Sequence, residues 1–176
     1  MIRSAKLIYR GSEYDFSPKS FYNRCNGVNN CMTIVKTSTN KLIGGFCPQP
    51  LVHHDEEQIP EKGLYAEDKT KRSFIFNISA LRSYNIRMVK KALIYKKEQA
   101  GPIFGEDLEI GEAVTSNIGH SYESDSNISI DSLEAKVHLL EAQKAEIKDL
   151  EIWQLSFWLI DRQLLSSRIW WAVLKI

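Results

Sequence analysis

The sequence predicts an α+β protein in which two antiparallel β-sheets pack as a sandwich, flanked by short helices. Several short segments rich in β-branched and aromatic residues follow one another without regular alternation of strand and helix. Only two segments carry helical signals, and both are short. The length of 176 residues suits a single domain with its own core. We therefore expect one folded unit built mainly of strands.

The first helix is expected over residues 18–25. Ser17 is the candidate N-cap, and Pro18 falls at the first helical position, where a missing N–H costs nothing. Phe16 and Phe21 have the spacing of a hydrophobic staple across this cap. The sequence therefore predicts a helix whose entry is fixed by two aromatic rings.

A β-hairpin is expected from residues 32–36 and 41–47, which are joined by a turn-prone polar segment. Gly44 and Gly45 lie inside its second strand. Paired glycines weaken a strand, so they need a geometric reason: a bulge, a positive φ, or the close approach of a ring. The candidate rings are Phe74 and Phe104.

The remaining elements follow from composition and periodicity. Leu150 and Ile152 alternate with acidic residues, the pattern of a half-buried closing strand. Leu133, Val137 and Leu140 recur at helical spacing and predict a second helix. The other expected strands are residues 6–10, 73–78, 92–95 and 107–110, and the expected loops are a long one over 48–72 and a surface loop over 115–131.

The charge balance argues against electrostatic binding to nucleic acid or anionic lipid. Lys and Arg number 23 against 22 Asp and Glu, for a net charge of +1. The first 16 residues hold no apolar run of signal-peptide length, so a cytoplasmic location is expected. Partner choice should then rest on shape.

Cys25, Cys31 and Cys47 form an odd set without CxxC spacing, which suits reduced thiols better than a disulfide framework. Together with His53 and His54 they offer the ligand types of a zinc site, but their spacing matches no zinc pattern. We therefore expect neither a metal nor a cofactor, and small buried thiols instead.

Catalytic side chains are sought as a nucleophile beside a base or as paired carboxylates. His120 and Ser121 are adjacent, so in an extended segment they point to opposite faces and cannot form a dyad. Asp107 and Glu109 could share a strand face, but the glycine-rich run just before them favours a structural turn. No enzyme is therefore expected, with an uncharacterised hydrolase or redox enzyme as the rival.

The C-terminal segment differs from the rest of the chain. All four tryptophans fall between residues 153 and 176, so we divide the chain into a domain over 1–155 and an aromatic-rich tail over 156–176. Charged residues interrupt this tail, which excludes a bilayer span of ~20 apolar residues. The tail is expected to pack on the domain or dock on a partner, and a peripheral membrane adaptor remains an alternative.

A series of motifs in a fixed order carries a family resemblance. The motif residues are Arg10, Gly11, Ser12, Phe16, Phe21, Gly44, Gly45, Gly101, Phe104, Gly105, Asp107, Gly119, Ser121, Tyr122 and Glu151. In this order, over about residues 6–155, they resemble the TLDc domain of the oxidation-resistance family. The most specific part runs from Gly101 to Asp107 and continues at Gly119.

The resemblance implies a sandwich of two antiparallel sheets flanked by helices, in proteins that protect cells against oxidative stress. It implies structural or interaction roles for the motif residues, pairing of Arg10 with Glu151, and no catalytic mechanism. It also implies binding to the cytosolic part of the vacuolar-type proton ATPase. A cytoplasmic protein would then reach vacuolar or lysosomal membranes through that partner.

Three positions depart from the family pattern. Glu106 alone links Gly105 to Asp107 where the family has a Gly-His pair, so this loop should be tighter. A tryptophan common after the Gly-Gly strand is absent, and residues 48–54 stand in its place. Glu141 occupies the place of a glycine, which predicts a rebuilt turn with the second helix extended through Gln143.

Overall fold

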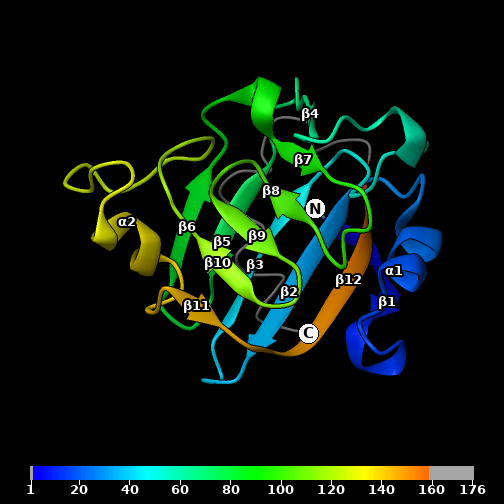
Figure 1. The fold of residues 1–176 in the computed structure, drawn as a ribbon, viewed down its shortest axis with the longest axis horizontal. Coiled ribbons are helices and arrows are strands. Elements are labelled where there is room, and N and C mark those ends of the chain that lie inside the picture. Colours follow the sequence, from blue (N-terminus) through cyan, green and yellow to red (C-terminus); the bar gives the residue numbers. More distant parts are fainter. Residues whose placement is uncertain (1, 159–176) are drawn as a thin grey trace.

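The computed structural model describes residues 2–158, which form three antiparallel sheets and two short α-helices (Figure 1). The first and last strands of the chain are neighbours in the largest sheet. That six-stranded sheet has the spatial order β1 (Ile2–Arg10), β12 (Ile147–Phe157), β2 (Cys31–Thr37), β3 (Leu42–Cys47), β5 (Phe74–Asn77) and β6 (Arg82–Asn85).

A smaller sheet covers one face of the six-stranded sheet. Its order is β11 (Lys144–Ala145), β10 (Val114–Ser116), β9 (Leu108–Ile110) and β8 (Ile103–Phe104). A two-stranded sheet joins β4 (Leu64–Ala66) to β7 (Leu93–Tyr95). The helices are α1 (Pro18–Cys25) and α2 (Leu133–His138), with 3-10 turns η1 (Gly11–Glu13), η2 (Glu56–Gln58) and η3 (Val89–Lys91). The α+β sandwich class is confirmed, with the β4–β7 sheet as an addition to the two sheets expected.

The core between the layers is aliphatic and aromatic. Its buried members come from both sheets and from α1, and they include Ile43 and Ile75 of the larger sheet, Phe104 and Leu108 of the smaller one, and Phe21 of the helix. Burial of such side chains stabilises the fold by roughly 1.5–3 kcal/mol each. The strands of the two layers are therefore held together by one continuous apolar interior.

The first helix is confirmed over the expected residues. Ser17 is its N-cap by position, but its side chain makes no capping hydrogen bond. The ring of Phe21 packs edge-on against Tyr9, with centroids 5.6 Å apart, whereas the ring of Phe16 lies against Gly11. Both rings belong to the same core, and a direct staple contact between them stays a prediction.

The hairpin is confirmed as β2 and β3, which pair without a register shift. Neither Gly44 nor Gly45 has a positive φ, so close approach is the reason for both. A Cβ on Gly45 would lie 2.7 Å from the Phe104 ring, as expected. A Cβ on Gly44 would overlap the carbonyl oxygen of Thr33 and lie 3.0 Å from the ring of Phe76, not Phe74.

Several expected boundaries were wrong. The loop over 48–72 contains η2 and β4, and the surface loop over 115–131 includes the fully buried Ile118, Ser121 and Tyr122. The second helix ends at His138 and does not extend through Gln143. Glu141 instead adopts the left-handed conformation itself, at φ 57°, and its carboxylate pairs with Lys41 at 2.6 Å. The turn at residue 141 is thus formed by a non-glycine residue in the left-handed conformation.

Candidate functional site

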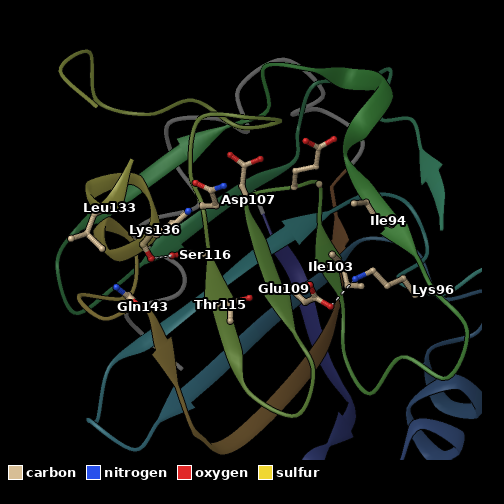
Figure 2. Close-up of a pocket in the computed structure, with 13 residues that line it drawn as sticks. Ile94, Lys96, Ile103, Asp107, Glu109, Thr115, Ser116, Leu133, Lys136 and Gln143 are labelled. Atoms are coloured by element: carbon tan, nitrogen blue, oxygen red, sulfur yellow. Dashed lines mark hydrogen bonds and ion pairs between the residues drawn. The ribbon is translucent and has the colours of Figure 1, made fainter. Parts of the chain in front are cut away.

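A cleft of about 640 Å³ lies on the outer side of the four-stranded sheet (Figure 2). Its walls come from β7 to β10, from α2, and from the turn between β8 and β9. Figure 2 shows Leu133 and Lys136 on the α2 side and Lys96 beside Glu109 on the opposite side. The cleft is therefore built from segments far apart in the sequence.

Asp107 forms the buried end of this cleft. Its side chain is fully buried, and its carboxylate accepts backbone N–H groups of Gly119 at 2.7 Å, His120 at 3.0 Å and Ser121 at 2.5 Å. Burial raises the pKa of Asp107, although these donors favour the ionised form. The carboxylate thus fixes the loop after β10. Glu109 has a different partner, the ammonium of Lys96 at 2.9 Å, so the two carboxylates do not act as a pair.

The turn between β8 and β9 requires its glycine. Gly105 has φ 53°, and a Cβ there would overlap the side chain of Ser121. The Ser121 hydroxyl accepts the backbone N–H of Glu106 at 3.2 Å and has no hydrogen bond to His120. The Ser121 hydroxyl is thus engaged by the turn between β8 and β9. Gly101 is equally confined, because a Cβ there would lie 2.7 Å from the carbonyl oxygen of Ile110.

Glu106 is the centre of a polar network at the mouth of the cleft. Its carboxylate accepts from the ammonium of Lys91 and the hydroxyl of Tyr65, both at 2.5 Å. The ring of His120 lies 3.4 Å away on one side and 3.0 Å from Asp131 on the other. The Lys91 hydrogen bond, followed by that of Tyr65, lowers the pKa of Glu106. Glu106, the one residue between Gly105 and Asp107, thus contacts three neighbouring side chains.

The TLDc domain family profile matches residues 2–156. The chain belongs to the TLDc family. No curated protein sequence matches it. TLDc domains are generally regarded as non-catalytic, and the family is associated with oxidative stress. No helix among the described residues is long and apolar enough to cross a bilayer.

The N-terminal TLDc motif residues form a second group at the β1–β12 pair. Arg10 bonds Glu151 at 2.7 Å, which confirms the pairing implied by the resemblance. The backbone N–H of Ser12 donates to Asp149 at 3.2 Å. Gly11 lies under the ring of Phe16, where a Cβ would not fit. This group joins β1 and η1 to β12, the last strand of the TLDc domain.

The three cysteines of this TLDc domain are free, buried thiols. Burial raises the pKa of Cys31 and Cys47 to about 12 and that of Cys25 even further. They are therefore protonated at neutral pH and weak nucleophiles. Among residues 2–158, no group of three or more His, Cys, Asp or Glu side chains is arranged to hold a metal ion.

Asp68 is a structural anchor that the sequence reasoning missed. It is fully buried and accepts the backbone N–H groups of Thr70 at 2.9 Å, Arg72 at 2.9 Å and Ser73 at 2.8 Å. Burial opposes its ionisation, yet the hydrogen bonds of Thr70 and Ser73 outweigh burial and lower its pKa. The signal in the sequence was an aspartate two residues before a threonine, typical of an Asx-turn.

Proposed function

We propose that this TLDc domain is a non-catalytic module of oxidative-stress protection that binds and regulates the vacuolar-type proton ATPase. The observation that carries the proposal is the family match over residues 2–156, which spans the whole sandwich. The resemblance of its motifs implies a contact with the cytosolic part of the pump. The protein would then be cytoplasmic and reach vacuolar or lysosomal membranes through that contact.

The hydrogen bonds made by the polar groups at the cleft support a protein-binding function over a catalytic one. Asp107 is engaged by backbone N–H groups, and Ser121 accepts from a backbone N–H. The buried cysteine thiols are held protonated. A hydrolase or redox enzyme needs a nucleophile beside a base that can reach substrate. The purified protein should therefore have no peroxidase or hydrolase turnover, and turnover abolished by Cys25→Ser or His120→Ala would contradict this.

We propose that this cleft is the surface of the chain that binds the pump. The buried motif residues Gly105 and Asp107 shape it from beneath, which explains why they belong to the motif without reaching a partner. Above them, Leu133 is 63% exposed beside Lys136 and opposite Lys96. An apolar side chain within a charged rim is typical of a protein-binding surface.

A pull-down from cytosol and vacuolar membranes tests the proposal, with the pump's cytosolic subunits detected by mass spectrometry. The full chain is expected to retain them, and Leu133→Glu to lose them, because a charge replaces the apolar centre. Leu81→Glu is the matched control, since Leu81 is 75% exposed in the turn between β5 and β6. If both variants retain the pump subunits equally, the cleft is not the binding surface. If the unmodified chain retains no pump subunits, the proposed function itself is refuted.

The alternative of a peripheral membrane adaptor depends on residues 156–176, most of which lie outside the described residues. Flotation of the full chain with liposomes that lack any pump separates the two functions. The proposed function predicts that the protein stays in the soluble fraction, because membrane recruitment requires the pump. Flotation with protein-free liposomes would favour the adaptor.

A further inference from the structure

The six-stranded sheet has a second apolar face, on the side away from the four-stranded sheet. Trp153, Met32, Phe46 and Phe74 are directly paired across β12, β2, β3 and β5, so they form one cross-strand row. Side chains at paired positions point to the same side of a sheet. The rings of Phe46 and Phe74 lie 5.7 Å apart along this row. We call this surface the outer face.

The outer face is buried, although one sheet supplies its described members. Phe46 is 0% exposed, Met32 2%, and Phe76 and Leu155 3% each. The partly buried residues around them are Ile2, Ala5, Ile34, Ile78, Trp153 and Phe157. These residues lie on strands of the six-stranded sheet or, for Ile78, directly after β5. Within residues 2–158, neither the other two sheets nor the α-helices contribute to this cluster.

A single sheet cannot bury its own face. Side chains on one face stand side by side and are shielded only at their flanks, so full burial requires a second layer about 10 Å away. The Phe46 ring, with Phe74 on one side and Phe157 at 6.0 Å, still has its outward edge to cover. Among the described residues outside the sheet, Arg72 reaches this face, with its guanidinium 5.9 Å from the Phe157 ring. One guanidinium cannot cover the whole row, so the rest of the cover is sought outside residues 2–158.

We propose that residues 159–176 of this chain pack across the outer face and form a third layer of the fold. Strand β12 ends at the outer face, because its last residue, Phe157, belongs to the outer-face cluster. Trp158 follows, 53% exposed, with the guanidinium of Arg3 5.1 Å from its ring. The chain thus leaves β12 at the border of the face that needs a cover.

Composition and length suit residues 159–176 to this role. Eleven of these eighteen residues are apolar, including Trp170 and Trp171. Eighteen residues span about 27 Å as a helix, and the five strands that carry the outer face are about 19 Å across. The segment is long enough to cross the sheet once. The tail is then part of the folded domain and neither a linker nor a membrane anchor.

Photo-crosslinking of the full chain tests this contact. Ile34, which is partly buried on β2 in the outer face, is replaced by the photoreactive residue p-benzoylphenylalanine. A second variant carries the probe at Ile2, on β1 at another part of the same face, in case the first fails to fold. The matched control carries it at Thr115, an exposed position in the cleft on the opposite layer.

After irradiation at low protein concentration, mass spectrometry is expected to find intramolecular crosslinks from positions 34 and 2 to peptides within residues 159–176. The control at position 115 should give none to that segment. Crosslinks from position 34 or 2 only to a second copy, detected as dimers, would overturn the proposal. So would folded variants whose probes at positions 34 and 2 react with solvent alone. A failure of pump binding would leave this result untouched, because the crosslink requires no partner.

Discussion

Each face of the six-stranded sheet carries one of the two adjacent glycines of β3, but the two faces are covered in different ways. On the inner face, Gly45 lies under the ring of Phe104, which comes from the four-stranded sheet. On the outer face, Gly44 lies beside the ring of Phe76, which comes from the same sheet. The inner contact therefore joins two layers and the outer one stays within a layer. The family match covers both layers of the inner contact, whereas the proposed cover of the outer face begins beyond residue 156. The inner packing thus lies within the matched range, whereas the third layer that we propose for the outer face lies beyond it.

The largest expected effects come from removing one ring on each face. Phe104→Ala should lower the free energy of unfolding by about 3–5 kcal/mol, because the ring is fully buried between the layers. Phe46→Ala should cost a similar amount if a third layer covers the outer face. Urea denaturation of both full-length variants measures the difference. A negligible cost for Phe46→Ala beside a large one for Phe104→Ala would show that the outer face is not packed.

Smaller effects are expected from adding a methyl group to each glycine. Gly45→Ala forces a Cβ to within 2.7 Å of the confined Phe104 ring, and Gly44→Ala forces one onto the backbone of Thr33. Each should destabilise by about 1–3 kcal/mol, with Gly44→Ala the larger because backbone cannot rotate away. Gly111→Ala is the control, since its Cβ would meet nothing within 4 Å. A melting temperature unchanged in all three variants would remove close approach as the reason for the paired glycines.

Two buried aspartates offer a pH test of the same comparison. Asp68 fixes the segment that leads into β5 of the six-stranded sheet, and its pKa is lowered in the folded state. The contribution of Asp68 to the free energy of unfolding is therefore present above its ordinary pKa of 3.8. It is lost as the pH falls through the lower pKa of the folded state. Asp107 fixes the loop beside the four-stranded sheet, and its raised pKa has the opposite sign: its contribution is present at low pH and is lost as the pH rises through the folded value.

Asp68→Asn should accordingly cost about 1–3 kcal/mol at neutral pH and much less on strong acidification, where the native carboxyl is protonated as well. The stability cost of Asp107→Asn should not decrease at low pH in this way. Denaturation curves between neutral pH and about pH 2 distinguish the two variants. The same acid dependence in both would mean that the two anchors do not differ as their hydrogen bonds and burial indicate.

The smallest effect on stability is expected at the cleft. Leu133→Glu alters an exposed side chain, so the free energy of unfolding should change by no more than about 0.5 kcal/mol. Thermal denaturation beside the Leu81→Glu control measures it. A large loss of stability in Leu133→Glu alone would give this leucine a structural role, and its effect on binding could then not be assigned to the cleft.

The sequence predicted the elements that carry strong local signals. The helix over residues 18–25 was found by its proline and flanking cap, and the β2–β3 hairpin by its turn and alternation. Strand β6, with the sequence Arg-Ser-Tyr-Asn, was missed because it has one buried residue in four and is stabilised by pairing with β5. Strands of two or three residues, such as β8 and β10, acquire their conformation from neighbours distant in sequence.

The candidate site was predictable as a set of residues but not as a shape. Gly105, Asp107 and Ser121 were named as motif residues, and the structure brings them into contact at the turn between β8 and β9. The cleft above them also requires Leu133 of α2 and Lys96 after β7, which join it only through tertiary packing. Periodicity identified Leu133 as part of a helix without indicating that its side chain is exposed.

The rate of ATP hydrolysis by the isolated vacuolar-type pump, measured as the full-length chain is added, tests the proposed function most directly. Binding and regulation predict that the rate changes and reaches a plateau when the chain matches the pump in amount, and that Leu133→Glu abolishes the change while Leu81→Glu preserves it. An unchanged rate at all concentrations, or a change that continues with time at trace amounts of the chain, would contradict a stoichiometric, non-catalytic regulator.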